Sequence, residues 1–490
     1  MQKLALLLAT LSLLLAPSCA TRKLEVSAIP VPLTGFSVPL PKIPLRLPNV
    51  FFFFQDDTNL EHLSWVEAFD ALHARLSVEY PFTAWKGGVA WDALHARFRP
   101  EIETAEAAGD EDAYYLSLRR YLHSVRDGHV TVETNETLRA VHAGAWFGLE
   151  VVALDDGRVV AKMVSAGGPA SSAEILPGAQ ILAVNGRPAT EALEAVDTIW
   201  ADVPPATAEG LRLTQLDLLF RDSPGATREI TYLNPGETER QTVNLRAIAK
   251  QEFGERNVTV EDAPIESRTL EPGYGYLRIA AIAPTLEMPF PEKALQRMIG
   301  ALVEAKTPGL VIDLRGTVGG ANNLVPMFAG FFYDAPGHYE DVAVYDKRKK
   351  DFSIDERARL PIPPLQPYFD GPVVLLVDAE TMGSAEGLAM ALARRPNAQV
   401  LGFHGTHGSS GILGGSVMMP GELLVNFPTG RSLDADGKIQ LETNGAGEGG
   451  VTLDVRVPVD EAVVRAISEG RDVLLEKAVE RLDSATWRFP

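Results

Sequence analysis

Residues 373–403 read VVLLVDAETMGSAEGLAMALARRPNAQVLGF and determine the fold of the segment around them. The run 373–377 is continuously apolar and rich in valine, which is typical of a strand covered on both faces. Small residues then turn the chain, 385–393 continues as an apolar helix, and 400–403 is the next apolar strand. Because strand, helix and strand in this order build a sheet with helices packed on it, the sequence predicts a layered α/β domain.

The chain before this domain changes character twice. Residues 143–250 hold short β-type runs separated by Gly-Pro and Asn-Gly turns. Residues 60–125 instead show the apolar spacing of amphipathic helices. We therefore expect a multidomain α/β protein of three units, with a helical N-terminal domain at 59–140, a β-rich domain at 141–250 and the α/β domain at 251–490.

The N-terminus has the features of an export signal. Lys3 precedes an apolar run at 4–16, which as a helix is about 20 Å long and too short for the ~30 Å hydrocarbon core of a bilayer. Such a run suits a signal-peptide core. The following Ala-Pro-Ser-Cys resembles the bacterial lipoprotein signal, in which Cys19 becomes the acylated first residue; the alternative is a plain secretory signal cut nearby. We expect a signal peptide at 1–18, a proline-rich tether at 19–58, and a protein exported to a bacterial cell envelope, held on the periplasmic side by its lipid.

Composition and charge exclude several classes of function. The 490 residues include 45 Lys and Arg against 65 Asp and Glu, a net charge of −20 at pH 7. This balance argues against a broad basic surface for nucleic acid or anionic lipid. The single cysteine excludes an internal disulfide framework and a multi-cysteine metal site, and no H-E-x-x-H pattern is present. We therefore expect no metal, no cofactor and no nucleic-acid partner.

Ser384 stands where the turn after the buried strand opens into the helix. This position presents a hydroxyl at the sheet edge, beside helix N–H groups that could receive a developing oxyanion. The alternative is a helix N-cap, in which the hydroxyl satisfies only the first backbone donors. A nucleophilic serine also needs a base. His129 follows a tight Asp-Gly turn into a strand, whereas His404 and His407, in a glycine-rich loop, are rival candidates.

A second glycine-rich turn follows the expected strand in residues 310–320, LVIDLRGTVGG. Glycines let backbone N–H groups approach a ligand closely. The stretch lacks the Lys-Ser/Thr ending of a phosphate loop and the spacing of a dinucleotide fingerprint. A nucleotide site is therefore excluded here, and the turn either brings backbone N–H groups to a ligand or is a simple bend.

Together these motifs resemble those of the tail-specific, C-terminal-processing serine peptidases, a family that includes the tricorn core protease. The motifs are DGH at 127–129, a PDZ-like pattern at 147–186, DLRGTVGG at 313–320, TMGSAE at 381–386 and GEGGVTLD at 447–454. The resemblance implies a helical domain, a PDZ-like domain and a ClpP/crotonase-like catalytic domain. It also implies a serine peptidase that acts on peptides or unfolded protein tails without a cofactor.

The resemblance further implies the catalytic residues. Ser384 corresponds to the nucleophile. His129 corresponds to the base of the tricorn-like branch, because Ser409 stands where the other branch has a lysine. The resemblance assigns Glu448 to orient the histidine, with Glu442 as the alternative.

The same resemblance assigns the groups that bind substrate. Gly319 and Ala385 would offer backbone N–H groups to the oxyanion, and Gly148 and Leu149 would lie at the loop that receives a peptide carboxylate. Departures from the family pattern leave open a catalytically decayed member that binds peptides or other ligands. An α/β-hydrolase esterase is disfavoured, because G-x-S-x-G is missing around the serine and the chain order differs.

Overall fold

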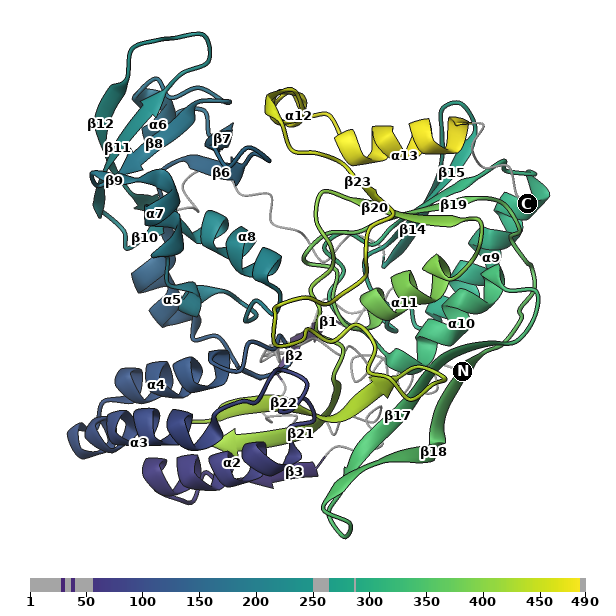
Figure 1. The fold of residues 1–490 in the computed structure, drawn as a ribbon, viewed down its shortest axis with the longest axis horizontal. Helices are drawn as coiled ribbons and strands as arrows, with labels where there is room; N and C mark the ends of the chain where they lie inside the picture. Colours follow the sequence, from purple (N-terminus) through teal and green to yellow (C-terminus); the bar gives the residue numbers. More distant parts are fainter. Residues whose placement is uncertain (1–27, 31–36, 40–55, 250–263, 286–287, 485–490) are drawn as a thin grey trace.

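The computed structural model of the chain is shown in Figure 1. It describes residues 28–30, 37–39, 56–249, 264–285 and 288–484. The expected signal peptide, Cys19 and most of the expected tether lie outside the described residues. Within the tether, Ala28–Pro30 (β1) pairs antiparallel with Ser37–Pro39 (β2). Among the helices of the described ranges, none combines the length and apolar character that a bilayer crossing needs.

A six-stranded sheet is the middle layer of the C-terminal unit, and its neighbours are parallel except for the first pair. In order, its strands are Ile265–Leu270 (β14), Tyr274–Ile279 (β15), Leu310–Asp313 (β16), Val373–Leu376 (β19), Ala398–Gly402 (β20) and Val455–Arg456 (β23). The helices Pro291–Glu304 (α9), Val325–Ala329 (α10) and Ser384–Ala393 (α11) cover one face, and Glu461–Ser468 (α12) and Val473–Asp483 (α13) cover the other. Every residue of β16 and β19 is buried, which confirms the predicted α/β layering.

The structure has a second sheet that the sequence patterns did not predict. It joins a strand near the start of the described chain with strands of the C-terminal unit. In order, its strands are Asp351–Ile362 (β18), Gly337–Asp346 (β17), Leu423–Leu433 (β22), Ile412–Met419 (β21) and Asp56–Asn59 (β3). The strands are antiparallel except that β3 runs parallel to β21, and Thr131–Val132 (β4) also pairs with β22. N-terminal residues thus complete a sheet that the C-terminal unit builds.

Three helices, Trp65–Glu79 (α2), Trp91–Ala108 (α3) and Glu111–His123 (α4), pack on this sheet, as Figure 1 shows at the lower left. Ser64 opens α2 with a capping box, and Asp110 caps α4. Their apolar side chains share one core with side chains of β21 and β22, namely Val417, Met419, Val425 and Phe427. The helical unit is therefore completed by strands from the far end of the chain.

The unit between these two parts is a small sheet with helices beside it (Figure 1, upper left). In order, its strands are Gln241–Arg246 (β12), Thr227–Leu233 (β11), Gln180–Val184 (β8), Val159–Val164 (β7) and Leu149–Ala153 (β6). The strand β6 ends the sheet, and the helix Ala208–Leu218 (α8) packs beside it. One strand edge is thus flanked by a helix, which is the arrangement a strand-adding peptide needs.

Arg119 of α4 joins the helical unit to this small unit and is completely buried. Its Nε donates to Ile199 O at 2.7 Å, and its guanidinium also donates to Ala201 O and to Val132 O. One side chain thus satisfies three carbonyl groups, two in residues 199–201 and one in β4.

Replacing Arg119 with methionine should lower the free energy of unfolding by about 3 kcal/mol, because buried carbonyl groups lose a charged donor. The neighbouring Arg120→Ala is the matched control, since Arg120 is partly exposed and its ion pair with Asp197 is worth at most about 1 kcal/mol. Urea unfolding followed by circular dichroism measures both variants. Equal losses in the two variants would contradict the assigned role of Arg119.

Candidate active site

The chain turns sharply between β19 and α11, and this turn presents Ser384. Asp378 holds the turn, because its Oδ1 accepts from the N–H groups of Gly316 at 3.0 Å and Thr381 at 2.9 Å. Gly383 has φ +61°, in the left-handed region that favours glycine. Gly383 is also the N-cap and Ser384 is the first helical residue, so the Ser384 hydroxyl does not serve as the cap. Ser384 keeps 7% of its surface accessible and begins the helix at the carboxyl edge of the sheet.

His129 lies against this turn from the other side of the interface between units. In the chain it stands between α4 and β4, with Val130 separating it from the strand. Its Nε2 is 3.6 Å from the position that a Cβ atom would take on Gly383. The imidazole nitrogen therefore faces the residue next to Ser384. The other ring nitrogen, Nδ1, is buried and has no hydrogen-bond partner among the described residues.

Charged groups next to His129 set its protonation. Burial is the main cause that lowers its pKa, and the positive charge of Lys86 lowers it further, whereas Asp127 acts in the opposite direction. Asp127 is fully buried, accepts from the backbone N–H of His129 at 2.9 Å, and accepts from Tyr80 Oη at 2.7 Å. The imidazole is thus held neutral by its surroundings.

Of the two glutamates expected to orient His129, Glu442 is the buried one. It pairs with Lys86 at 2.8 Å and accepts from the backbone N–H of Ser410 at 2.9 Å. Burial, assisted by Asp127, raises the pKa of Glu442 to about 8. Glu448 instead lies on an exposed turn, where its carboxylate accepts from Asn444 at 3.3 Å. Neither carboxylate bonds to Nδ1 of the imidazole, so the expected role of Glu448 gains no support from this geometry.

The two expected oxyanion donors converge on one oxygen atom. The N–H of Gly319 donates to the carbonyl of Met382 at 3.0 Å, and the N–H of Ala385 donates to the same carbonyl at 3.2 Å. The structure therefore brings these donors together, but a carbonyl of the chain itself occupies the point where they meet.

The DLRGTVGG motif shapes the loop that carries Gly319. Arg315 pairs with Asp313 at 2.6 Å and with Asp472, at the N-terminus of α13, at 2.8 Å. Thr317 is completely buried, and its hydroxyl donates to Ile279 O at 2.6 Å. The polar residues of this motif thus fix the loop to the sheet.

The rival histidines have other partners. His407 lies near His129, and burial, with the charge of His129 second, lowers its pKa to about 4. Its Nδ1 is 3.1 Å from Ser409 Oγ. His404 pairs through Nδ1 with Glu209 of α8 at 2.8 Å. Each of these rings thus has a polar partner other than Ser384.

Glu386 is a buried residue of the site to which the sequence patterns gave no role. Its carboxylate accepts from Thr406 Oγ1 at 2.6 Å and from the N–H of Gly383 at 3.1 Å. Burial raises its pKa to about 7. Its position in TMGSAE, three residues after Gly383, is the capping-box spacing, and this was the available signal.

The expected peptide loop lies at the start of β6. Gly148 has φ +78°, and a Cβ there would lie 3.0 Å from Pro169 Cδ. Leu149 is 2% exposed, and its side chain belongs to the core of the small unit. Only the backbone of these two residues is thus placed to receive a ligand.

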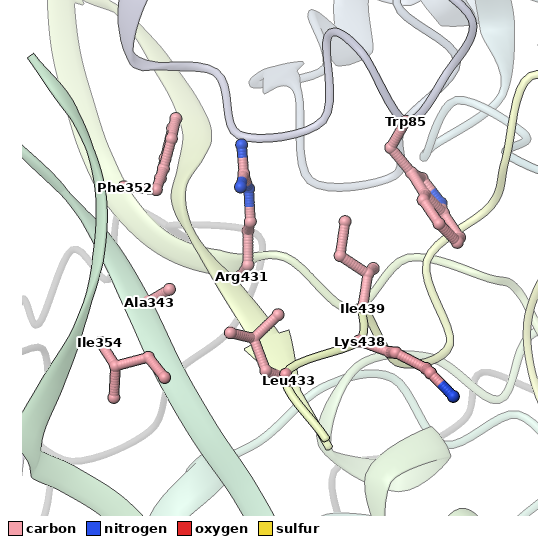
Figure 2. A pocket seen from close by; sticks show the side chains of 9 residues that line it. Trp85, Ala343, Phe352, Ile354, Arg431, Leu433, Lys438 and Ile439 are labelled. Carbon is pink, nitrogen blue, oxygen red and sulfur yellow. The ribbon is translucent and has the colours of Figure 1, made fainter. Parts of the chain in front are cut away.

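A largely apolar cavity of about 500 Å³ lies between the helical unit and the second sheet (Figure 2). Trp85, Phe352, Leu433 and Ile439 line it, and Arg431 crosses it with its guanidinium 4.1 Å from the ring centroid of Phe352. The indole Nε1 of Trp85 donates to Glu442 O at 3.0 Å. One wall of the cavity is therefore bonded to the backbone of the acidic residue near His129. Over the described ranges, no cluster of three or more His, Cys, Asp or Glu side chains could hold a metal ion.

Comparison with known proteins gives a family and a fold. Residues 273–457 match the model of Peptidase family S41. The structure of mature CPAF complexed with lactacystin is similar, with a TM-score of 0.60 at 14% identity over 86% of this chain and 98% of that chain. A protein of Parabacteroides merdae described as a peptidase has a TM-score of 0.50 at 16% identity over 86% and 98% of the two chains. No curated protein matches the chain.

The imidazole of His129 should titrate below its ordinary pKa of 6.5, because burial and Lys86 both disfavour the charged form. Lys86→Met should raise this pKa, since it removes the positive charge that disfavours the imidazolium. Histidine ring signals in an NMR pH titration measure it, with His129→Gln used to assign the signal. Lys477→Met is the control, because Lys477 pairs with Glu480 on α13, away from the histidine. An unchanged pKa in Lys86→Met would refute the assigned electrostatics.

Proposed function

We propose that this chain, which carries the serine hydrolase domain of peptidase family S41 at residues 273–457, is an exported peptidase that cleaves peptides or unfolded protein tails. The nucleophile is Ser384 and the base is His129. The observation that carries the proposal is the distance of 3.6 Å between His129 Nε2 and the Cβ position of Gly383, across an interface between two units. Export, and acylation of Cys19, rest on the sequence alone.

Catalysis begins with proton transfer to the imidazole. The neutral ring of His129 takes the proton of Ser384 Oγ as this oxygen adds to the carbonyl carbon of the peptide bond. The imidazolium then gives the proton to the leaving amine, and the C–N bond breaks to leave an ester on Ser384. Water, deprotonated by the same ring, hydrolyses the ester and restores the serine. The lowered pKa of His129 keeps the ring neutral, as a base must be.

The tetrahedral intermediate needs the N–H groups of Gly319 and Ala385. Because both groups donate to the carbonyl of Met382, this carbonyl must turn away when substrate binds. Gly383 supports such a rotation of the peptide plane, since glycine occupies positive and negative φ with similar ease, and the rotation releases the hydrogen bond from the Gly383 N–H to Glu386. Removing one oxyanion donor typically costs about 10²–10³ in rate, so this rearrangement is part of the proposed cycle.

The negative charge that offsets the imidazolium comes from Asp127. Asp127 raises the pKa of His129 and accepts from its backbone N–H. Glu442 pairs with Lys86, but its raised pKa disfavours the charged form of its carboxyl group. We therefore assign the supporting role to Asp127 in preference to Glu448.

The small unit, which we take as PDZ-like, would capture the substrate. A peptide added beside β6 would pair with the free strand edge and lie along α8, with its carboxylate at the loop of Gly148. Backbone pairing accepts many sequences, which suits unfolded tails as substrates.

The position of the Met382 carbonyl also favours a second candidate, a member of the family that binds peptides without cleaving them. Fluorophosphonate labelling separates the two functions, because only an activated serine reacts. In the binding protein Ser384 would stay unlabelled.

Ser384→Ala and His129→Ala should each lower the rate of peptide hydrolysis by at least about 10³-fold, because nucleophile and base act as one unit. The assay follows unfolded casein or C-terminal peptides with the full exported chain. Ser468→Ala is the control, since its hydroxyl donates to Arg465 O on α12, outside the site. Hydrolysis at the wild-type rate in either active-site variant would disprove the assignment.

Gly148→Ala, made in the Ser384→Ala background, should weaken binding of a peptide with a free carboxylate by about tenfold, because a left-handed alanine costs roughly 1–2 kcal/mol and its Cβ displaces the loop from Pro169. Fluorescence anisotropy with an amidated peptide as reference measures this loss. Gly157→Ala is the matched control, because Gly157 has φ +87° in the same unit but open space around its Cβ. Equal weakening in both variants would argue against capture at Gly148.

A further inference from the structure

The carboxylate of Glu386 ties the first turn of α11 to the loop 406–409. One oxygen accepts from Thr406 Oγ1 at 2.6 Å and from the N–H of Gly408 at 2.7 Å. The other accepts from the N–H of Gly383 at 3.1 Å and from the N–H of Ser409 at 3.3 Å. Glu386 is completely buried, so these four donors take the place of water.

The loop 406–409 in turn holds the segment that carries the base. Ser409 Oγ accepts from the N–H of Gly128 at 2.9 Å, and Gly128 directly precedes His129. A Cβ on Gly128 would lie 2.5 Å from His407 Cε1, so the turn and the loop are packed as closely as a glycine allows. The side chain that accepts the Gly128 N–H thus belongs to a residue whose own backbone is fixed by Glu386.

We propose that Glu386 is a positioning residue that sets the separation between base and nucleophile. Glu386 lies in the same first turn of α11 as Ser384, and its carboxylate holds the turn of His129 through the backbone of Ser409. A single buried residue therefore fixes the positions of both the nucleophile, Ser384, and the base, His129. This inference rests on the proposed function, because it concerns the reaction of Ser384.

The four hydrogen bonds at Glu386 require a side chain whose two terminal atoms both accept hydrogen bonds. Three of the four partners are backbone N–H groups, which cannot accept. The fourth, the Thr406 hydroxyl, already accepts from the N–H of Val451 at 2.7 Å and therefore directs its proton to Glu386. Glutamine has the same size, but its NH₂ group would face two donors. Glu386→Gln thus removes the function of the carboxylate without opening a cavity.

The chain offers a matched control in Glu340 of β17. This residue is 2% exposed, its carboxylate bonds to Asn322, and burial raises its pKa to about 7, as for Glu386. Its hydrogen-bond partners among the described residues, Asn322 and Ser432, lie outside the turns of Ser384 and His129. Glu340→Gln therefore reproduces the loss of a buried carboxylate without the proposed connection.

The test measures the second-order rate of fluorophosphonate labelling at Ser384 in the full chain, which needs no peptide capture. We expect Glu386→Gln to lower this rate by about 10²-fold, because a small displacement of base from nucleophile has an effect of that size. Ser409→Ala, which removes one hydrogen bond, should lower it by about tenfold. The double variant should be no slower than Glu386→Gln, since both changes act along one path; independent effects would instead multiply to about 10³.

Each outcome decides between the two proposals. An unlabelled wild-type chain would overturn the proposed function and this inference with it. A labelled wild type, with folded Glu386→Gln labelled at the same rate, would overturn the inference alone. The inference alone also fails if Glu340→Gln slows labelling equally, or if the double variant shows the product of the single effects. Should Glu386→Gln fail to fold, Ser409→Ala decides, because wild-type labelling there contradicts the proposal.

Discussion

The hydrogen bond from the Gly128 N–H to Ser409 Oγ joins segments that are 281 residues apart in the chain. Around this bond, the helices α2, α3 and α4 close their core with side chains from β21 and β22. The position of His129 relative to Ser384 therefore depends on packing between units and not on chain connectivity. A change that loosens the shared core would separate the two residues even though neither is altered.

The α/β unit could be predicted because its signal is local. The run 373–377 is buried on both faces in β19, and no solvated face interrupts its apolar pattern. The resemblance to the family was inferred from five ordered motifs, and the model of Peptidase family S41 matches residues 273–457, which hold three of them. Ser384 and His129 were singled out because each follows a turn of small residues, and the resemblance to the family then assigned their roles. Their approach in the structure agrees with that interpretation without testing the chemistry.

The remaining features depend on contacts between distant segments. The strand β18 is an exception, because its apolar residues at 352, 354, 358, 360 and 362 alternate with polar ones and mark a strand that could have been predicted. Glu442 became buried because Lys86 and the Ser410 N–H approach it from other segments, and nothing near residue 442 announces these partners. The motif around Glu448 seemed more informative, yet its carboxylate lies on a solvated turn. Sequence motifs identify candidate functional residues, whereas the tertiary fold decides whether those residues are buried and which groups they contact.

The Met382 carbonyl accepts from the N–H groups of Gly319 and Ala385, so the chain itself occupies the oxyanion site when no substrate is bound. An inhibitor that mimics the oxyanion of the tetrahedral intermediate must therefore displace this carbonyl before it can bind the two N–H groups. If the occupied arrangement is favoured by about 1.4 kcal/mol, the apparent affinity of such an inhibitor falls tenfold below its intrinsic value. Inhibition then develops at the rate at which the backbone rotates and not at the rate at which the inhibitor meets the protein. Latency of this kind would protect a hydrolase, and the proteins around it, until an extended peptide supplies a better-placed oxygen.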